Sequence, residues 1–395
     1  MKLCGVIAEY NPFHNGHARQ LRQARALTGC DYVIACVAGG IVQRGEVALL
    51  DKWTRARMAL CHGADLVVEL PALFAVRPAE LFARGGVMTL EALGVDVLSF
   101  GCETDDLPLL RRAAELLARE DEDLSAETRR GLDAGQSHAR ARGEAVERRL
   151  NLPASFLNRP NTALALEYLK ALDGLTRPIE PCLVPRVGDY HGEELGRFAS
   201  ASAIRGAVMR CEAVKTAQAM PLDCYAAMRD CLDAGQFARV DALDQALILR
   251  LRSADPAELA ALCEAGEGME NLFMKHAAEA GSREDLLERV KTKRYTYARL
   301  SRFCAQTLLG MTREAALAHP APEYARVLGF RRDAAPLLRH LKETGKLPLV
   351  TDVTRLKEND LFRFDRAATD LQALAMAAPE ARAAGQDFTR QIVTV

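Results

Sequence analysis

The sequence predicts an α/β protein, with a parallel sheet in its first two hundred residues and a mostly helical remainder. Over the first hundred residues, short apolar runs suited to β-strands alternate with amphipathic helical patterns. Such alternation is typical of parallel strands that are joined by right-handed helical crossovers. From about residue 216 onward the alternation stops, and helical patterns such as those over 256–265 and 284–291 predominate.

The expected strands are short, apolar and bounded by turn-forming residues. They cover residues 1–8, 31–38, 65–70, 95–100 and 179–185. The expected helices lie between them, over 18–24, 54–62, 79–93 and 162–172, with a further helix that starts at residue 200. Ligands gather at the carboxyl ends of parallel strands. We therefore expect His14, Gly39–Gly40 and Gly101, which follow strand ends, to line one crevice.

Changes of pattern along the 395 residues predict more than one domain, because the chain is longer than one ordinary core requires. The α/β pattern occupies residues 1–215, and a charged helical insertion interrupts it near 105–155. The helical region occupies 216–395, within which 352–360 is expected to be a polar turn.

Composition indicates a soluble protein of the cytoplasm. No apolar run is long enough to cross a membrane, and the first strand follows Met1 without a signal-peptide pattern. The eleven cysteines include no Cys-x-x-Cys pair, which indicates reduced thiols and neither a disulfide framework nor a structural zinc site. The formal net charge of −1 means that a nucleic-acid partner would need a local basic patch.

The most informative run joins the first expected strand to the first expected helix, and reads Glu9-Tyr-Asn-Pro-Phe-His14-Asn-Gly-His17. A helix N-terminus offers free backbone N–H groups and a positive dipole end, which suit a phosphate. His14 and His17 stand three residues apart, so their rings point to one side of a first helical turn and can flank one phosphate. Taken alone, His-x-Gly-His could be a simple turn. Its place between a strand and a helix favours the phosphate site.

Two later runs have features of phosphate-binding patterns. Gly40 to Gly45 has the glycine spacing of a P-loop but lacks the following Lys and Ser/Thr, which excludes that motif. Ser200-Ala-Ser202-Ala-Ile-Arg205 begins a helix with hydroxyl caps and ends on a cation. By itself this run could be only a helix cap.

The His-x-Gly-His run resembles the signature of the HxGH nucleotidyltransferase superfamily, whose members transfer nucleotidyl groups on a Rossmann-like sheet. The resemblance implies that His14 and His17 are catalytic and stabilise charge on the α-phosphate. Superfamily members also carry a later Ser/Thr-rich helix start that ends in a basic residue. On this ground Ser200, Ser202 and Arg205 are expected to hold the outgoing phosphates of ATP.

Further motifs are similar to those of the bacterial tRNA(Met) cytidine acetate ligase family, over nearly the whole chain. They are residues 8–17, Gln43-Arg-Gly-Glu46, Asp51-Lys-Trp-Thr-Arg55, residues 65–71, Ser99-Phe-Gly101, residues 291–299 and Val327-Leu-Gly-Phe330. The resemblance implies an enzyme that uses ATP to activate acetate as acetyl-adenylate. The acetyl group would then pass to N4 of the wobble cytidine in the anticodon loop of elongator tRNA(Met). The sequence departs from the family pattern at residues 38–41 and at Arg159-Pro160.

The same resemblance assigns ATP binding and catalysis to residues 1–215 and tRNA binding to 216–395. The expected cofactors are ATP and Mg²⁺, with the cation bridging phosphate oxygens and no protein residue assigned to it as a ligand. The residues implied to contact ATP are Ile7, Ala8, Glu9, Tyr10, Asn11, Pro12, Phe13, His14, Asn15, Gly16, His17, Ala18, Arg19, Gln20, Gly101, Asn161, Arg186, Ser200, Ser202 and Arg205.

A basic segment, residues 289–302, indicates an RNA partner independently. It contains no acidic residue, and its cations lie around Tyr295 and Tyr297. Cations bind RNA phosphates, and aromatic rings stack on unpaired bases. A solvated helix face is the alternative explanation. The expected tRNA-binding residues are Lys291, Lys293, Arg294, Tyr295 and Arg299, and the cations that could extend the patch are Arg326, Arg331, Arg332, Arg339 and Lys342.

Two other functions stay open at this point. A nucleotidyltransferase that condenses ATP with a phosphorylated cofactor precursor would explain both phosphate motifs but leaves the basic segment without a purpose. A nucleotide sensor or RNA-binding protein without catalytic activity would not require both histidines. The sequence leaves the choice of tRNA, the choice of acyl acid, the general base of acyl transfer and the oligomeric state open.

Overall fold

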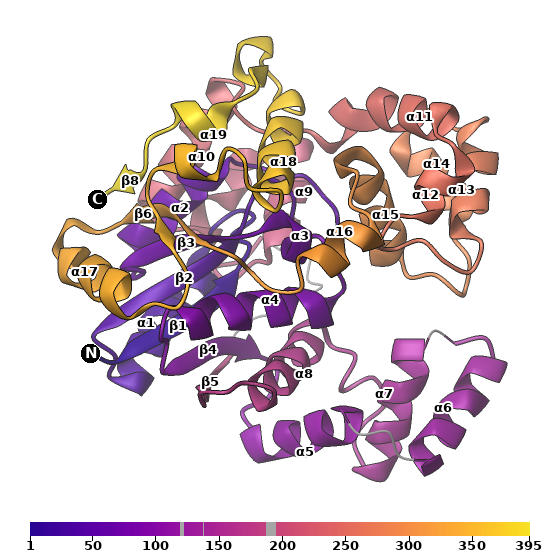
Figure 1. Ribbon diagram of the computed structural model, residues 1–395, viewed down its shortest axis with the longest axis horizontal. Helices are drawn as coiled ribbons and strands as arrows, with labels where there is room; N and C mark the ends of the chain where they lie inside the picture. The colour runs from indigo at the N-terminus through magenta and orange to yellow at the C-terminus, as the bar shows by residue number, and fades with distance from the viewer. Residues whose placement is uncertain (119–121, 137, 187–194) are drawn as a thin grey trace.

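The computed structural model describes residues 1–118, 122–136, 138–186 and 195–395 (Figure 1). Within these residues, an eight-stranded sheet has the order β5-β4-β1-β2-β3-β6-β7, and β8 pairs with β6. The strands are β1 (Leu3–Ala8), β2 (Tyr32–Ala38), β3 (Leu66–Leu70), β4 (Val97–Cys102), β5 (Glu180–Pro185), β6 (Ala325–Phe330), β7 (Leu349–Val350) and β8 (Val393–Thr394). The first five are parallel, which confirms the predicted α/β fold and all five predicted strands.

Three strands lie after residue 216, where the sequence pattern indicates helices and predicts no strand. β6 pairs antiparallel with β3, and β7 and β8 each pair with β6. The two outer strands have two residues each, too few to show the alternating pattern of a strand. β6 is apolar throughout except for Arg326, and a short apolar run is compatible with a buried helix as well as a strand.

Helices cover both faces of the sheet. Successive residues of a strand point to opposite faces, and both sets of side chains are mostly apolar here and must be buried. In β1, Leu3 and Ile7 belong to one buried cluster and Cys4 and Val6 to the other. The helices next to the parallel strands are α1 (Asn15–Thr28), α2 (Lys52–Cys61), α3 (Ala72–Ala75), α4 (Ala79–Ala92), α8 (Pro160–Asp173) and α9 (Ala201–Met209). The predicted charged insertion is helical, with α5 (Leu107–Ala118), α6 (Glu122–Asp133) and α7 (His138–Arg149).

The described part of the chain after residue 216 is mostly helical, as predicted. Its α-helices are α10 (Leu222–Asp233), α11 (Asp244–Ser253), α12 (Pro256–Ala260), α13 (Met269–Ala277), α14 (Arg283–Val290), α15 (Tyr297–Leu309), α16 (Arg313–Ala318), α17 (Ala335–Thr344), α18 (Phe362–Leu374) and α19 (Gln386–Thr389). Short 3-10 turns cover Ala213–Ala219, Val240–Leu243, Arg332–Ala334, Val353–Leu356 and Pro379–Arg382. The helix predicted over 256–265 ends at Ala260.

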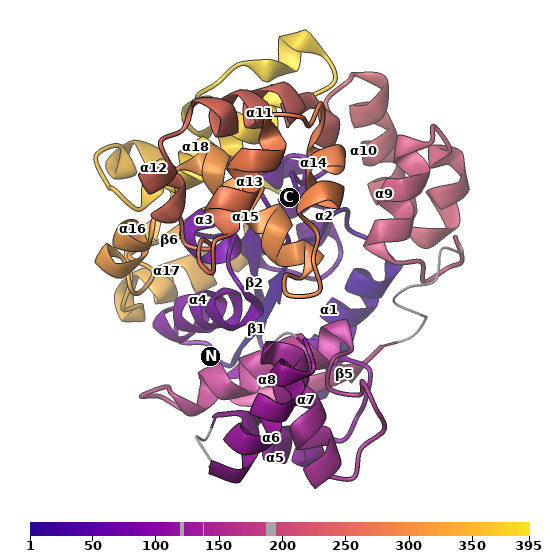
Figure 2. The same ribbon diagram turned by 90° about the vertical axis from the view of Figure 1, so that its right-hand side faces the viewer.

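Helices α11 to α15 enclose a hydrophobic core of their own. Its buried residues all fall between Leu247 and Cys304, and the rings of Phe273 and Phe303 pack with centroids 4.4 Å apart. In Figures 1 and 2 these helices form a separate lobe above the insertion α5–α7. No helix in the described ranges combines the length and apolarity that a membrane span requires.

A buried ion cluster joins the C-terminal segments to the parallel sheet. Lys52 Nζ lies 2.6 Å from Glu69 Oε1 and 2.8 Å from Asp387 Oδ1. Arg326 Nη1 lies 2.8 Å from Glu69 Oε2 and 2.6 Å from the same Asp387 oxygen. All four side chains are buried, and the two cations and two anions alternate around the cluster. The cluster thereby connects β3 and α2 with β6 and α19.

Breaking this cluster should be costly. In Asp387→Ala, Lys52 and Arg326 would share the single carboxylate of Glu69, and loss of one partner from a buried pair costs about 3–5 kcal/mol. Urea unfolding followed by circular dichroism measures the change. Asp333→Ala is the matched control, since it removes an exposed partner of Arg331 and should cost about 1 kcal/mol or less. Equal effects of the two substitutions would contradict the role of the cluster.

Candidate active site

The two histidines begin the first helix. His14 is the N-cap of α1, and its Nδ1 accepts a hydrogen bond from Gly16 N at 3.0 Å. His17 Nδ1 accepts one from His14 N at 3.2 Å, which completes a reciprocal capping box. The rings stack with centroids 3.7 Å apart and planes 20° apart. The prediction that both rings lie on one side of the first turn is confirmed.

These hydrogen bonds fix the protonation of both rings. A nitrogen that accepts from a backbone N–H carries no proton, so each neutral imidazole carries its hydrogen on Nε2. Burial lowers the pKa of His14 to about 3, and the charge of Arg186 contributes. Burial, His14 and Arg186 in turn hold the pKa of His17 well below its usual value. The pair therefore offers two Nε2–H donors at neutral pH, and no positive charge.

Arg55 holds the segment that leads into the histidines. Its buried guanidinium donates to Glu9 O at 2.6 Å, Ala38 O at 2.8 Å and Leu50 O at 3.0 Å, and also to Gly39 O. Three of these carbonyls follow or end β1 and β2. Burial lowers the pKa of Arg55 to about 10, which leaves it a cation at neutral pH.

The predicted phosphate motif lies against the same segment. Ser200 caps α9 by accepting from Ala203 N at 3.1 Å, while Ser202 is exposed. Arg205 Nη1 donates to Asn11 O at 2.7 Å, and its Nη2 lies 3.3 Å from Glu46 Oε2. The guanidinium is thereby tied to the residues just before the histidines, although they stand almost two hundred positions away in the chain.

Residues at the ends of β4 and β5 lie near the histidines, since the charge of Arg186 acts on both imidazoles. Arg186 Nη1 donates to Asn161 Oδ1 at 2.8 Å, and Asn161 in turn donates to Glu103. Burial alone would raise the pKa of Glu103, but hydrogen bonds from Asn161 and Thr162 lower it, so this carboxylate stays ionised. Gly101 leaves the space beside Arg186 open. Sequence reasoning missed Glu103, whose position just after a strand end was the available signal.

Gly39 and Gly40 do not line this crevice, and that expectation is wrong. Both glycines are buried. A side chain at Gly39 would collide with the Glu69 carboxylate, and one at Gly40 with the backbone of Ala368 in α18. The departure from the family pattern at residues 38–41 is therefore a packing feature, in which small residues admit a helix from the C-terminal part.

The basic segment lies at the end of α14 and the start of α15. Lys291, Lys293 and Arg294 are exposed, and Lys291 Nζ donates to Tyr295 O at 2.6 Å. Tyr295 is only 4% exposed, and its hydroxyl donates to Glu267 O at 2.8 Å. Its ring therefore packs inside the lobe. The expectation that it stacks on an RNA base is wrong. The neighbouring Tyr297 is 50% exposed.

The remaining cations of this region are mostly held by carboxylates. Arg299 lies over the Tyr295 ring and pairs with Glu264 at 3.6 Å and Glu267 at 3.4 Å. Arg302 is buried against Glu264. The expected extension of the patch is wrong. Arg326 belongs to the buried ion cluster, and Figure 1 shows the neighbourhood of α17 on the opposite side of the molecule from α15, with Arg331, Arg332, Arg339 and Lys342.

Known proteins resemble the chain along its length. The family model of the HIGH Nucleotidyl Transferases matches residues 1–387. A tRNA(Met) cytidine acetate ligase of Clostridium perfringens is 35% identical over 94% of each chain, and one of a Thermoanaerobacter species is 36% identical over the whole of both. Two crystal structures of Thermotoga maritima TmcAL, bound with alpha-thio ATP and apo, cover both chains fully. Their TM-scores are 0.92 and 0.93, at 31% and 30% identity.

The buried histidines should make stability fall in acid. An unfolded histidine binds a proton below its ordinary pKa of 6.5, whereas folded His14 resists protonation down to about 3. Stability is therefore lost as pH falls through this window, by about 1–2 kcal/mol between pH 7 and pH 5 for this one group. His14→Asn keeps a capping side chain and should lose that part of the pH dependence in urea unfolding at the two pH values.

His340→Asn on α17 is the control for removing a histidine elsewhere. If His14→Asn retained the full pH dependence of the original chain, the neutral, buried state of His14 would be contradicted.

Proposed function

The chain belongs to the HIGH nucleotidyl transferases and, among them, to the tRNA(Met) cytidine acetate ligase family, and from this premise we propose that it acetylates N4 of the wobble cytidine in elongator tRNA(Met), using ATP and acetate. The observation that carries the proposal is the pair of neutral imidazoles at the start of α1, between Arg205 and Arg186. The full-length similarity to TmcAL bound with alpha-thio ATP supports the nucleotide.

In the first step, an acetate oxygen attacks the α-phosphorus of ATP in line, and the bond to pyrophosphate breaks. Acetate is already ionised, so this step needs no base. The Nε2–H groups of His14 and His17 would donate to the α-phosphate oxygens as charge develops there. Because both rings are neutral, the two buried histidines do not repel each other. The free N–H groups at the start of α1 add to the same field.

We propose that Ser202 and Arg205 hold the departing pyrophosphate, and that the other members of the predicted ATP set contact the nucleotide. Mg²⁺ prefers carboxylate and phosphate oxygens. Glu46, beside Arg205, is a carboxylate of this kind and would hold the cation. When bound, the cation neutralises charge on the phosphates. Near the ends of β4 and β5, Arg186 is held by Asn161, and Gly101 would let the nucleotide approach the backbone.

In the second step, cytidine N4 attacks the acyl carbon of acetyl-adenylate. The N–C bond forms, the bond to AMP breaks, and the amine proton leaves. Positioning of the amine against the acyl carbon is the main contribution that we assign to the protein here.

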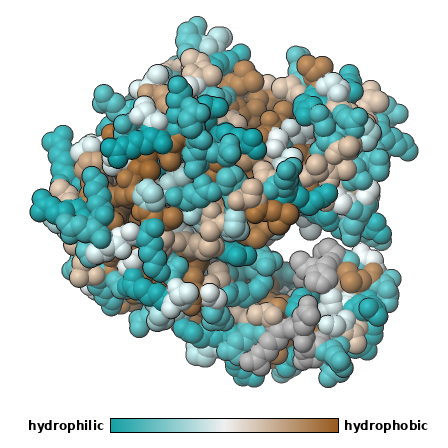
Figure 3. All heavy atoms as spheres, in the orientation of Figure 1, coloured by the Kyte–Doolittle hydropathy of each residue, from teal (hydrophilic) through white to brown (hydrophobic). Residues whose placement is uncertain are grey.

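We assign tRNA binding to the lobe α11–α15 and in particular to Lys291, Lys293, Arg294 and Arg299, with Tyr297 as the exposed ring. Tyr295 would act by holding Arg299 in place. Figure 3 shows the surface hollowed between this lobe and the insertion α5–α7, which offers a path for an RNA loop toward the sheet. A small-molecule nucleotidyltransferase would have no use for this lobe. The proposed compartment is the cytoplasm.

The histidine donors should be essential for activation. His17→Ala is expected to reduce acetate-dependent ATP–pyrophosphate exchange by about 10²–10³, the usual effect of losing one donor to a developing oxyanion. Loss of its part in the capping box should cost only about 1 kcal/mol of stability. Affinity for tRNA, measured on the same preparation, is the control and should not change. Normal exchange by this variant would exclude the assigned role.

The exposed cations should govern RNA binding but not activation. In the double variant Lys293→Ala/Arg294→Ala, the loss of about two phosphate contacts should reduce the slope of log affinity against log salt by about 1–2. Filter binding of tRNA over a range of salt concentrations measures this. ATP–pyrophosphate exchange should remain near that of the original chain.

Arg339→Ala/Lys342→Ala is the matched control, because it removes two exposed cations from α17 on the other side of the molecule. A decrease in tRNA affinity with the control and none with the test variant would place the RNA elsewhere.

A further inference from the structure

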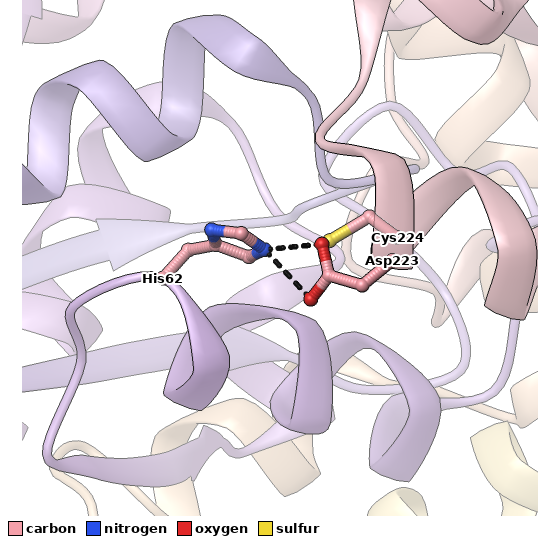
Figure 4. A group of neighbouring side chains, drawn as sticks. All are labelled: His62, Asp223 and Cys224. Carbon is pink, nitrogen blue, oxygen red and sulfur yellow. Dashed lines mark hydrogen bonds and ion pairs between the residues drawn. The ribbon is translucent and has the colours of Figure 1, made fainter.

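Three potential metal ligands meet where α2 ends and α10 begins. His62 is the C-cap of α2, and Asp223 and Cys224 lie in the first turn of α10 (Figure 4). One ligand atom from each residue lies within 4.8 Å of the other two. His62 Nε2 is 2.9 and 3.0 Å from the two Asp223 oxygens. Among the described residues, this is the one such group of three.

The donor set is specific in its chemistry. An imidazole nitrogen, a carboxylate oxygen and a thiolate sulfur are the donor types that bind zinc, whereas magnesium and calcium take oxygen ligands alone. Bond lengths of about 2.0–2.3 Å in a tetrahedral site place ligand atoms roughly 3.5 Å apart. The three ligand atoms lie within 4.8 Å of one another, so a separation at that limit must shorten by about 1.3 Å, while the 2.9 Å between His62 Nε2 and Asp223 Oδ1 must lengthen by about 0.6 Å. Asp223 can supply that movement because its side chain is 58% exposed.

The surroundings allow a cation to enter and to be held. Cys224 is buried and forms the floor of the group, while His62 and Asp223 face the exposed side. Cys61 directly precedes His62, and its thiol is close enough to interact electrostatically with Asp223 and Cys224. The Cys61 thiol lies outside the group whose ligand atoms are within 4.8 Å of one another, so it would have to move to reach a fourth coordination position.

We propose that His62, Asp223 and Cys224 form a binding site for a thiophilic divalent cation of the zinc class, with the fourth position taken by Cys61 or water. The role is structural, because none of these residues belongs to the proposed ATP set. The His62 ring stacks on Phe13, with centroids 5.6 Å apart and planes 27° apart. A cation here would join α2 to α10 and would steady the segment that carries the catalytic histidines.

Cobalt(II) titration of the metal-free full-length protein tests this directly, because thiolate-bound cobalt gives a charge-transfer absorption that oxygen and nitrogen ligands do not. We expect one equivalent to bind with this absorption, and zinc to displace it. Asp223→Asn should abolish stoichiometric binding. Asp230→Asn, which changes another exposed acid on the same helix, should not.

Cys224→Ser removes the sulfur and should abolish the charge-transfer absorption, while Cys304→Ser removes a buried thiol in another lobe and should leave it intact. Circular dichroism checks the folding of each variant. If Cys224→Ser does not fold, the exposed Asp223 pair decides. Absence of the absorption in the original chain, or its persistence in Asp223→Asn, would overturn the proposal and leave a His–Asp hydrogen bond beside a buried thiol. Neither result depends on the proposed tRNA activity.

Discussion

The guanidinium of Arg55 is the constraint on which the geometry of the site depends. Where β1 and β2 end, backbone carbonyls point into the protein without strand partners, and an unpaired buried carbonyl is costly. One rigid cation binds three of them, those of Glu9, Ala38 and Gly39, together with Leu50 O, and so fixes how the chain leaves both strands. The position of the two histidines follows from that exit. A lysine could not replace this arginine, because its single ammonium lacks the planar fork that reaches several carbonyls at once.

The two halves of the sequence are not independent structural units. The buried ion cluster places a β6 arginine and an α19 aspartate against residues of α2 and β3, and α18 packs over Gly40 beyond the end of β2. The sheet beside the proposed catalytic histidines is therefore completed by the last seventy residues of the chain. The lobe α11–α15 is different, since its core is its own. It is held beside the sheet by contacts such as that of Ser301 with Arg44 O at 2.6 Å.

The parts that sequence could predict are those in which the signal is local. The five parallel strands are apolar runs between turn residues, and the histidine pair is visible within four positions. Contacts between distant segments were not predictable in this way. Burial of Tyr295 depends on Glu267 and Arg299, and the group of His62, Asp223 and Cys224 joins residues 161 positions apart. Gly39 and Gly40 looked like crevice residues because α18, which covers them, has no counterpart in the local pattern.

In the capping box at the start of α1, His14 and His17 each have a structural role and a proposed chemical role. In each ring, Nδ1 accepts a backbone hydrogen bond at the start of the helix, which leaves the hydrogen on Nε2. Aspartate can cap a helix but offers no donor, and lysine donates but accepts nothing. At these two positions the demands of folding and chemistry therefore select the same residue. A substitution that removes both nitrogens from either position would therefore affect the start of the helix and the proposed donor together.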